Sequence, residues 1–279
     1  MSTGDGPWLV LNQASGSNDD DANRDLIERL GCAGMAPARV VDCAQDDLPT
    51  RSALKGAGVD LVVCHTGDGT LNALLTGLED WAGAVLVLPG GTTNLLSKAL
   101  HGDRTSAEIV ADLDSMRRTR RTCIRSDAGT ALIEVVAGPG ATWSDVREGL
   151  REGDLTATAT RAVEAARQST SGPMVAVAEP ALGRPDGYSG VRMVPEADGI
   201  VAAGYGAEGI GDYLKQGVAL LRRDFREGPH DELGRHPELV CRSVDGSGIE
   251  LMLDGERASG AAQIRFSLDS LRVDLLSGR

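Results

Sequence analysis

Two strand–turn–helix units follow each other between residues 60 and 100, and they restrict the possible folds more than any other part of the sequence. In the first, an apolar run over residues 60–64 leads to Gly67-Asp68-Gly69-Thr70 and then to leucines at positions 71, 74, 75 and 78. In the second, an apolar run over residues 84–88 leads to Pro89-Gly90-Gly91. Continuous apolar runs are typical of strands buried on both faces of a parallel sheet, and the leucine spacing is typical of a helix packed against it.

The remainder of the first part of the chain continues this alternation. Apolar runs at 8–11 and 39–41 predict two more strands, and the patterns at 20–30, 49–57, 92–100 and 106–116 predict helices. Strands that alternate with helices at this spacing form an open α/β sheet with helices on both faces. We therefore expect a doubly wound parallel-sheet domain over residues 1–116.

The pattern changes at Arg117-Arg118-Thr119-Arg120-Arg121, where a basic cluster follows a strongly acidic segment. Beyond it, residues 130–137, 249–253, 263–267 and 271–275 have strand character, and residues 142–151 and 213–223 are helix candidates. We expect a second, mainly β domain over residues 117–279. The basic cluster fits a solvated strand edge that pairs with the acidic first domain, or a contact with anionic lipid headgroups.

Composition excludes several classes of protein. The sequence has no apolar run near the roughly 20 residues of a membrane-spanning helix, and its start does not resemble a signal peptide. Five widely spaced cysteines without a Cys-x-x-Cys pair favour a reducing cytoplasm over a disulfide framework. A net charge of −13 argues against nucleic acid as a partner.

The Gly67–Thr70 turn has the chemistry of a phosphate site. Glycines let the backbone approach a bulky anion, and a helix that starts there directs free N–H groups toward it. The carboxylate of Asp68 would repel phosphate unless a cation such as Mg²⁺ lay between them. The alternative is a tight turn in which Asp68 only caps the helix.

The second turn, Pro89-Gly90-Gly91-Thr92-Thr93-Asn94, occupies the equivalent position after the next strand. Ligands of open α/β sheets bind beyond the carboxyl ends of the strands. Two glycine turns at the same edge therefore favour one ligand site with two walls.

Together these motifs resemble the diacylglycerol kinase catalytic domain family, which includes bacterial diacylglycerol and sphingoid-base kinases. The resemblance rests on Gly67-Asp68-Gly69-Thr70-Leu71-Asn72 followed by Pro89-x-Gly91-Thr92-x-Asn94. Three further segments agree in order along the chain: Leu11-Asn12-Gln13-Ala14-Ser15-Gly16, Pro195-Glu196-Ala197-Asp198-Gly199-Ile200 and Asp254-Gly255-Glu256.

The resemblance implies an α/β nucleotide-binding domain, a second β-sandwich-like domain, and phosphoryl transfer from ATP to a lipid with the help of Mg²⁺. It assigns nucleotide contacts to Asn12, Thr66, Gly67, Asp68, Gly69, Thr70, Asn72, Gly91, Thr92 and Asn94. Phosphoryl transfer depends mostly on positioning and charge neutralisation, which such residues supply.

Three carboxylates take specific roles by this resemblance. Glu256 is the expected general base, Asp68 serves catalysis and Mg²⁺ binding, and Asp198 belongs to a structural Mg²⁺ site with nearby backbone carbonyls. Taken alone, Asp254-Gly255 is a common hairpin signal, and Asp198-Gly199 is as well explained by a turn as by a metal site.

The sequence departs from the family pattern at Thr66, where glycine is usual, and at Ala73, where glutamate is usual. Two alternatives to a lipid kinase therefore stay open. One is an enzyme similar to NAD kinases, which share the first glycine turn, and the other is a catalytically silent nucleotide- or lipid-binding protein. The expected acceptor is the primary hydroxyl of a diacylglycerol or of a sphingoid or ceramide-like lipid, reached by a cytoplasmic protein that contacts the membrane transiently.

Overall fold

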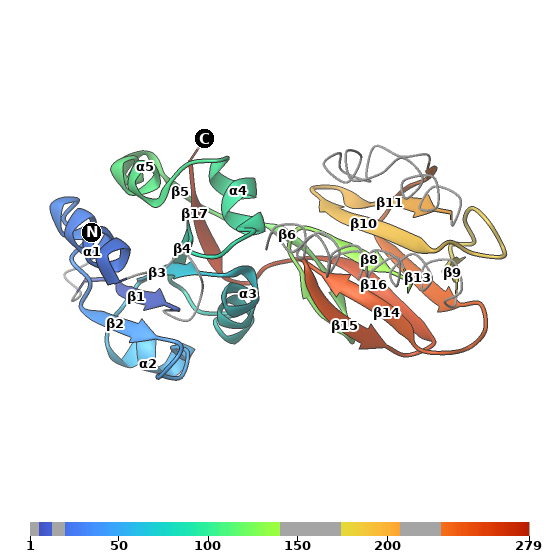
Figure 1. The fold of residues 1–279 in the computed structure, drawn as a ribbon, viewed down its shortest axis with the longest axis horizontal. Coiled ribbons are helices and arrows are strands. Elements are labelled where there is room, and N and C mark those ends of the chain that lie inside the picture. Colours follow the sequence, from blue (N-terminus) through green and yellow to red (C-terminus); the bar gives the residue numbers. More distant parts are fainter. Residues whose placement is uncertain (1–5, 13–19, 140–173, 207–229, 279) are drawn as a thin grey trace, which may run out of the picture. The chain divides into compact units, whose positions relative to one another are not determined.

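The computed structural model describes residues 6–12, 20–139, 174–206 and 230–278 (Figure 1). The chain divides into two compact units. Unit 1 comprises Met1–Arg121 together with Ser270–Arg279, and unit 2 comprises Thr122–Asp269.

Unit 1 is built on a six-stranded sheet in the order β2-β1-β3-β4-β17-β5. All neighbouring strands run parallel except β5, which is antiparallel to β17. Its strands are β1 (Trp8–Leu11), β2 (Arg39–Asp42), β3 (Leu61–Thr66), β4 (Ala84–Pro89), β5 (Arg117–Thr119) and β17 (Asp274–Ser277). Its helices are α1 (Asp20–Cys32), α2 (Arg51–Gly56), α3 (Asp68–Gly77), α4 (Leu95–His101) and α5 (Ser106–Ala111), followed by the 3-10 turn η1 (Leu113–Ser115).

Helices cover both faces of this sheet: α1 and α5 lie on one face, and α2 and α3 lie on the other (Figure 1). One core joins α1 and α5 to alternate residues of the strands: Leu9, Leu11, Leu26, Leu30, Val63, Leu86, Leu88, Ile109 and Val110. The leucine stripe of α3 is also buried, as its spacing predicts. The expected doubly wound parallel sheet is confirmed.

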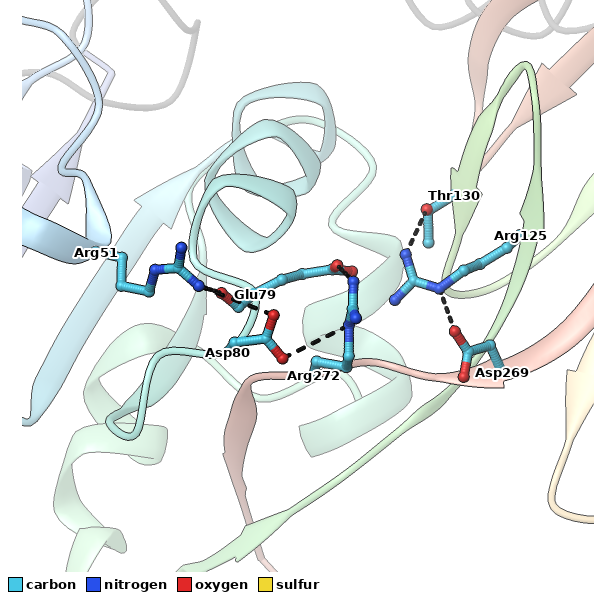
Figure 2. A network of polar contacts seen from close by, with 7 residues as sticks. All are labelled: Arg51, Glu79, Asp80, Arg125, Thr130, Asp269 and Arg272. Atoms are coloured by element: carbon cyan, nitrogen blue, oxygen red, sulfur yellow. Dashed lines mark hydrogen bonds and ion pairs between the residues drawn. The ribbon is translucent and has the colours of Figure 1, made fainter.

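A network of polar contacts holds the residues that directly follow the C-terminal end of α3 (Figure 2). Arg272 contacts Glu79 at 2.6 Å and Asp80 at 3.7 Å, and Arg51 donates to the backbone oxygen of Glu79 at 3.0 Å. Since the side chains of Arg51, Asp80 and Arg272 are about half exposed, their ion pairs stabilise the unit only slightly. Figure 2 also shows Arg125 bonded to Asp269, which belongs to unit 2.

Unit 2 consists of two antiparallel sheets that share one core. The first has the order β12-β11-β10-β8-β14-β15, and the second has the order β7-β6-β16-β13-β9. The first sheet comprises β8 (Val135–Ala137), β10 (Gly190–Glu196), β11 (Gly199–Tyr205), β12 (Asp231–His236), β14 (Ile249–Leu253) and β15 (Glu256–Gly260). The second comprises β6 (Thr122–Ser126), β7 (Gly129–Ala131), β9 (Val175–Glu179), β13 (Glu238–Ser243) and β16 (Gln263–Ser270).

Apolar residues from both sheets form the core of unit 2, which is the arrangement of a β-sandwich. Met193, Leu251 and Leu253 come from the first sheet, and Leu239 and Phe266 come from the second. The predicted sandwich-like architecture is thereby confirmed. The predicted helices 142–151 and 213–223 lie outside the described residues.

The division of the chain differs from the expected boundary at residue 117 because the chain returns to unit 1 at its end. β17 lies between β4 and β5, and Leu275 is fully buried there. The strand expected at 271–275 therefore belongs to the sheet of unit 1. The strand expected at 130–137 is also interrupted, because the backbone of residues 132–134 turns its N–H groups toward Asp254.

The basic cluster at 117–121 forms β5, the edge strand of the sheet of unit 1, and part of the following link. Arg118 donates to the backbone oxygen of Ala82 at 2.9 Å, and Arg120 pairs with Asp274 at 3.0 Å. The cluster therefore matches the expected strand edge within the acidic unit. In the part of the chain that the structure describes, no helix is both long and apolar enough to cross a membrane.

Candidate functional site

The two glycine turns meet at the carboxyl ends of neighbouring strands in unit 1. β3 and β4 pair in parallel, with Thr66 opposite Pro89. β1 pairs with the other side of β3, with Leu11 opposite His65, so Asn12 directly after β1 lies at the same edge. This edge is where open α/β sheets bind their ligands.

The backbones of the two turns contact each other directly, and this contact requires glycine in the second turn. A Cβ atom added at Gly91 would lie 2.5 Å from the Cα atom of Gly67. One added at Gly90 would lie 2.4 Å from the carbonyl carbon of His65 and 2.5 Å from the nitrogen of Thr66. The two turns thus form one continuous surface, as the sequence predicts.

Asn94 holds the second turn in shape. Its Oδ1 accepts from the Gly91 N–H at 2.8 Å, and its Nδ2 donates to the Gly91 carbonyl at 2.8 Å. Asn94 itself has a left-handed backbone with φ of 53° and precedes α4 directly. Asparagine tolerates this conformation better than most residues. Both ends of the amide therefore act on Gly91, which gives Asn94 a supporting position behind the surface.

Asp68 connects the first turn to the second. It is the first residue of α3, and its Oδ1 lies 3.5 Å from the backbone nitrogen of Leu96 in α4. It is also the only charged side chain within residues 66–70 and 89–94. A polyphosphate bound here would meet backbone N–H groups and one carboxylate.

Thr66 and His65 face inward at the end of β3. The Thr66 hydroxyl donates to the Gly67 carbonyl at 3.2 Å and lies 3.3 Å from the sulfur of buried Cys64. His65 Nε2 contacts the Pro89 carbonyl at 3.0 Å, and burial lowers the pKa of this imidazole. Thr66 can therefore reach a ligand only through its backbone, and His65 packs at the strand end as a neutral ring.

The remaining predicted nucleotide contacts are at least partly accessible. Gly67, Gly69, Thr70, Asn72 and Gly91 are half-buried, and Thr92 is exposed. Ala73, where the family pattern has glutamate, is exposed as well.

The described residues contain no group of three or more His, Cys, Asp or Glu side chains that could hold a metal ion. Asp198 lies in the two-residue turn between β10 and β11, where it pairs with Arg235. This ion pair is exposed, so the role of Asp198 in a structural Mg²⁺ site stays a prediction. Asp68 fits a Mg²⁺ site, since Mg²⁺ is commonly held by one or two carboxylates together with substrate phosphates.

Glu256 begins β15 in unit 2. It lies opposite Leu253 across a hairpin whose loop is Asp254-Gly255, so the turn expected from Asp-Gly is confirmed. The Glu256 side chain is exposed, and no hydrogen bond or ion pair holds it within the described ranges. A carboxylate in this state can accept a proton.

Sequence reasoning missed a second set of charged residues behind this hairpin. Asp254 and Glu134 are almost fully buried, and Glu134 pairs with Arg192 at 2.8 Å. Glu134 is the only acidic residue in an apolar stretch, which is a signal of a buried ion pair.

Comparisons with known proteins agree with this geometry. Residues 7–125 match the family model described as "Diacylglycerol kinase catalytic domain". None of the curated proteins matches the sequence.

Solved structures from Bacillus anthracis str. Sterne share the fold of the whole chain. One, described as a diacylglycerol kinase, aligns with a TM-score of 0.66 at 14% identity and covers 100% of this chain and 98% of that chain. Another, named only provisionally as a diacylglycerol kinase, aligns with a TM-score of 0.63 at 14% identity and the same coverage. At this identity the likeness establishes the fold.

Proposed function

We propose that the protein is a lipid kinase, because residues 7–125 match the family model of the diacylglycerol kinase catalytic domain. It transfers the γ-phosphoryl group of ATP to the primary hydroxyl of a lipid such as a diacylglycerol or a sphingoid or ceramide-like lipid. The family match supports kinase chemistry in general, and the assay described below identifies the acceptor lipid.

The observation that best supports the proposal is that neither the packing nor the backbone conformation at position 67 requires glycine. A Cβ atom at Gly67 would have only the Cα atom of Gly91 within 4 Å, at 3.9 Å, and its φ of −73° suits any residue. The fold therefore does not need glycine at this position. A site at which a bulky anion must come close to the backbone does need it.

The residues of the first unit would hold the nucleotide. Backbone N–H groups at the start of α3 would face the polyphosphate, and Asp68 would hold Mg²⁺ against it. Asn12, Asn72 and Thr92 would add contacts at the same edge. When bound, Mg²⁺ would neutralise charge on the phosphate oxygens. Asn94 keeps the second wall in place through Gly91.

Glu256 is the proposed general base. Its carboxylate would take the proton from the lipid hydroxyl as that oxygen attacks the γ-phosphorus atom, while ADP leaves with the electrons of the broken P–O bond. Its exposure and freedom from ion pairs in the described part of unit 2 suit this role.

One assay tests the proposal. The protein is incubated with γ-labelled ATP, Mg²⁺ and, separately, diacylglycerol, ceramide, sphingosine, monoacylglycerol and NAD. We expect label in at least one lipid and none in NAD, and we expect Glu256→Gln to abolish this transfer while ATP affinity is kept.

Other outcomes of the same assay separate the alternatives. Label only in NAD would show an NAD-kinase-like enzyme and overturn the lipid proposal. Binding of ATP without transfer to any acceptor would show a silent scaffold, for which the exposed Ala73 would be the first residue to restore to glutamate.

A further inference from the structure

The Asp254 carboxylate receives three consecutive backbone N–H groups from a segment more than a hundred residues away. Leu132 N–H donates to Oδ2 at 2.7 Å, and the N–H groups of Ile133 and Glu134 donate to Oδ1 at 2.8 and 2.9 Å. In return, the Asp254 N–H donates to the Glu134 carbonyl at 3.0 Å. Charge-assisted hydrogen bonds of this kind are stronger than neutral ones.

These bonds are protected from water, because Asp254 is only 7% exposed. A buried carboxylate is tolerated when hydrogen bonds satisfy its oxygens, and three amide donors do so here. The same donors leave Asp254 poorly placed to ligate a metal or to act on a substrate.

Asp254 also forms half of the hairpin loop that leads into Glu256. Asp254 and Gly255 have φ values of 51° and 92°, and β14 and β15 pair directly on either side of them, with Leu253 opposite Glu256. In so short a loop, the position of Asp254 determines where the first residue of β15 lies.

The segment that supplies the amides is itself anchored. The Glu134 carboxylate pairs with Arg192 of β10 at 2.8 Å, and Glu134 is 3% exposed. β8, which follows this segment, pairs with β10 on one side and with β14 on the other. The hairpin tip is therefore fixed to the middle of the sheet.

We propose that Asp254 is a positioning residue: through its three amide contacts it fixes the hairpin tip and so holds the Glu256 carboxylate where it takes up the lipid proton. This inference rests on the proposed function, which makes Glu256 the base. The two carboxylates of the Asp-Gly-Glu motif then have different roles: Asp254 binds backbone amides of the protein, and Glu256 accepts the proton of the lipid hydroxyl.

Asp254→Asn tests the inference because it keeps the size and the left-handed backbone preference of the side chain. The amide offers one acceptor oxygen and turns an NH₂ group toward an N–H donor, so at least one of the three contacts is lost. Since a shift of about 1 Å in a reacting group can cost about 100-fold, we expect kcat for lipid phosphorylation to fall by about that factor, with KM for ATP within about twofold of wild type.

Asp245→Asn is the matched control. Asp245 lies between β13 and β14, and its carboxylate also accepts a backbone N–H, that of Ser247 at 2.9 Å, and the Ser243 hydroxyl at 2.8 Å. The same chemical change at that loop should leave kcat within about twofold of wild type. A similar loss of kcat in both variants would overturn the positioning role.

Amide hydrogen exchange gives a readout that does not depend on activity. We expect exchange at residues 132–134 to become at least about tenfold faster in Asp254→Asn, with β16 unchanged. Faster exchange together with full kcat would overturn positioning, and unchanged exchange would overturn the anchoring itself.

A failure of the proposed function can be told apart from a failure of the positioning role. If the wild-type protein labels no lipid, the positioning role falls with that function, and the exchange rates still decide whether Asp254 anchors the hairpin. Should Asp254→Asn fail to fold, Glu134→Gln is the milder variant. It keeps all three amide donors and loosens only their support, and it should lower kcat by a smaller factor; full kcat in that variant would count against the proposal.

Discussion

At the scale of single residues, the glycines of the site divide into two kinds. Gly90 and Gly91 are needed for the contact between the two turns, since any side chain there would meet backbone atoms at 2.6 Å or less. Gly67 has room for a methyl group. The first kind serves the fold, and the second points to a ligand.

Gly67→Ala should therefore separate stability from binding. We expect Tm within a few degrees of wild type and ATP affinity lower by at least about tenfold, a loss of about 1.4 kcal/mol in binding free energy. Differential scanning fluorimetry and calorimetric titration with Mg·ATP measure the two quantities.

Two variants serve as controls for this prediction. Gly77→Ala at the other end of α3, where a Cβ atom meets nothing within 4 Å, should change neither quantity adversely. Gly91→Ala should lower Tm as well as affinity, because strained packing of this kind costs about 1–3 kcal/mol. Full ATP affinity in Gly67→Ala would show that the phosphate groups do not bind at this turn.

At the scale of elements, α5 shows how a short helix of six residues is fixed at its start. Thr105 and Glu108 form a capping box: Glu108 N–H donates to Thr105 Oγ1 at 3.3 Å, and Thr105 N–H donates to Glu108 Oε2 at 2.8 Å. Ile109 and Val110 of this helix complete the core over β1, β3 and β4. The cap thus supports the layer that covers the sheet.

Thr105→Ala removes the cap acceptor and should lower the free energy of unfolding by about 1 kcal/mol. Urea denaturation followed by circular dichroism measures this loss. Thr76→Ala, an exposed threonine in the last turn of α3, is the control and should cost much less. Equal losses in both variants would show that the capping box adds nothing.

The capping box also predicts a pH dependence. The backbone N–H and the hydroxyl of Thr105 both donate to Glu108 and hold the pKa of its carboxyl below 4.5. A lowered pKa in the folded state contributes stability above the ordinary pKa, and this contribution is lost as the pH falls through the folded value. The Tm advantage of wild type over Glu108→Gln should be present at pH 7 and should shrink below pH 4.5. An advantage that persists at lower pH would contradict this assignment.

The parts of the site that could be predicted from the sequence are those that depend on residues close together in the chain. The turns at 67–70 and 90–94 are local strand–turn–helix signals, and their common edge follows from parallel pairing, so both were predictable. The inward orientation of Thr66 and the pairing of Asp198 with Arg235 depend on side-chain packing, which no local pattern encodes. The amide contacts of Asp254 join residues far apart in the chain and were invisible for the same reason.

At the scale of the whole molecule, the chain leaves unit 1 at Arg121 and returns to it at Ser270. β17 then lies between β4 and β5, with Leu271, Val273 and Leu275 buried at or next to it. The apolar run at 271–275 predicts a strand, but only its pairing with β4 and β5 shows that it belongs to the sheet of unit 1. The expected boundary was therefore wrong at the C-terminal end.

This topology predicts that residues 1–121 do not fold as an isolated fragment, since the sheet would lack an interior strand. The same fragment with residues 270–279 attached through a short Gly/Ser linker should fold, with a cooperative thermal transition and native-like circular dichroism. A linked fragment that carries Leu275→Asp is the control and should stay unfolded, because it buries an unpaired charge. A cooperative transition in the fragment 1–121 alone would contradict the role of β17.

The return of β17 also sets an order of events during synthesis. A ribosome releases all of unit 2 before residues 274–277 appear, so the gap between β4 and β5 stays open while unit 2 is already complete in sequence. Domains generally fold as units while the chain emerges. Unit 2 can thus finish folding first although its sequence begins later, and unit 1 gains its last interior strand only after unit 2 has been made.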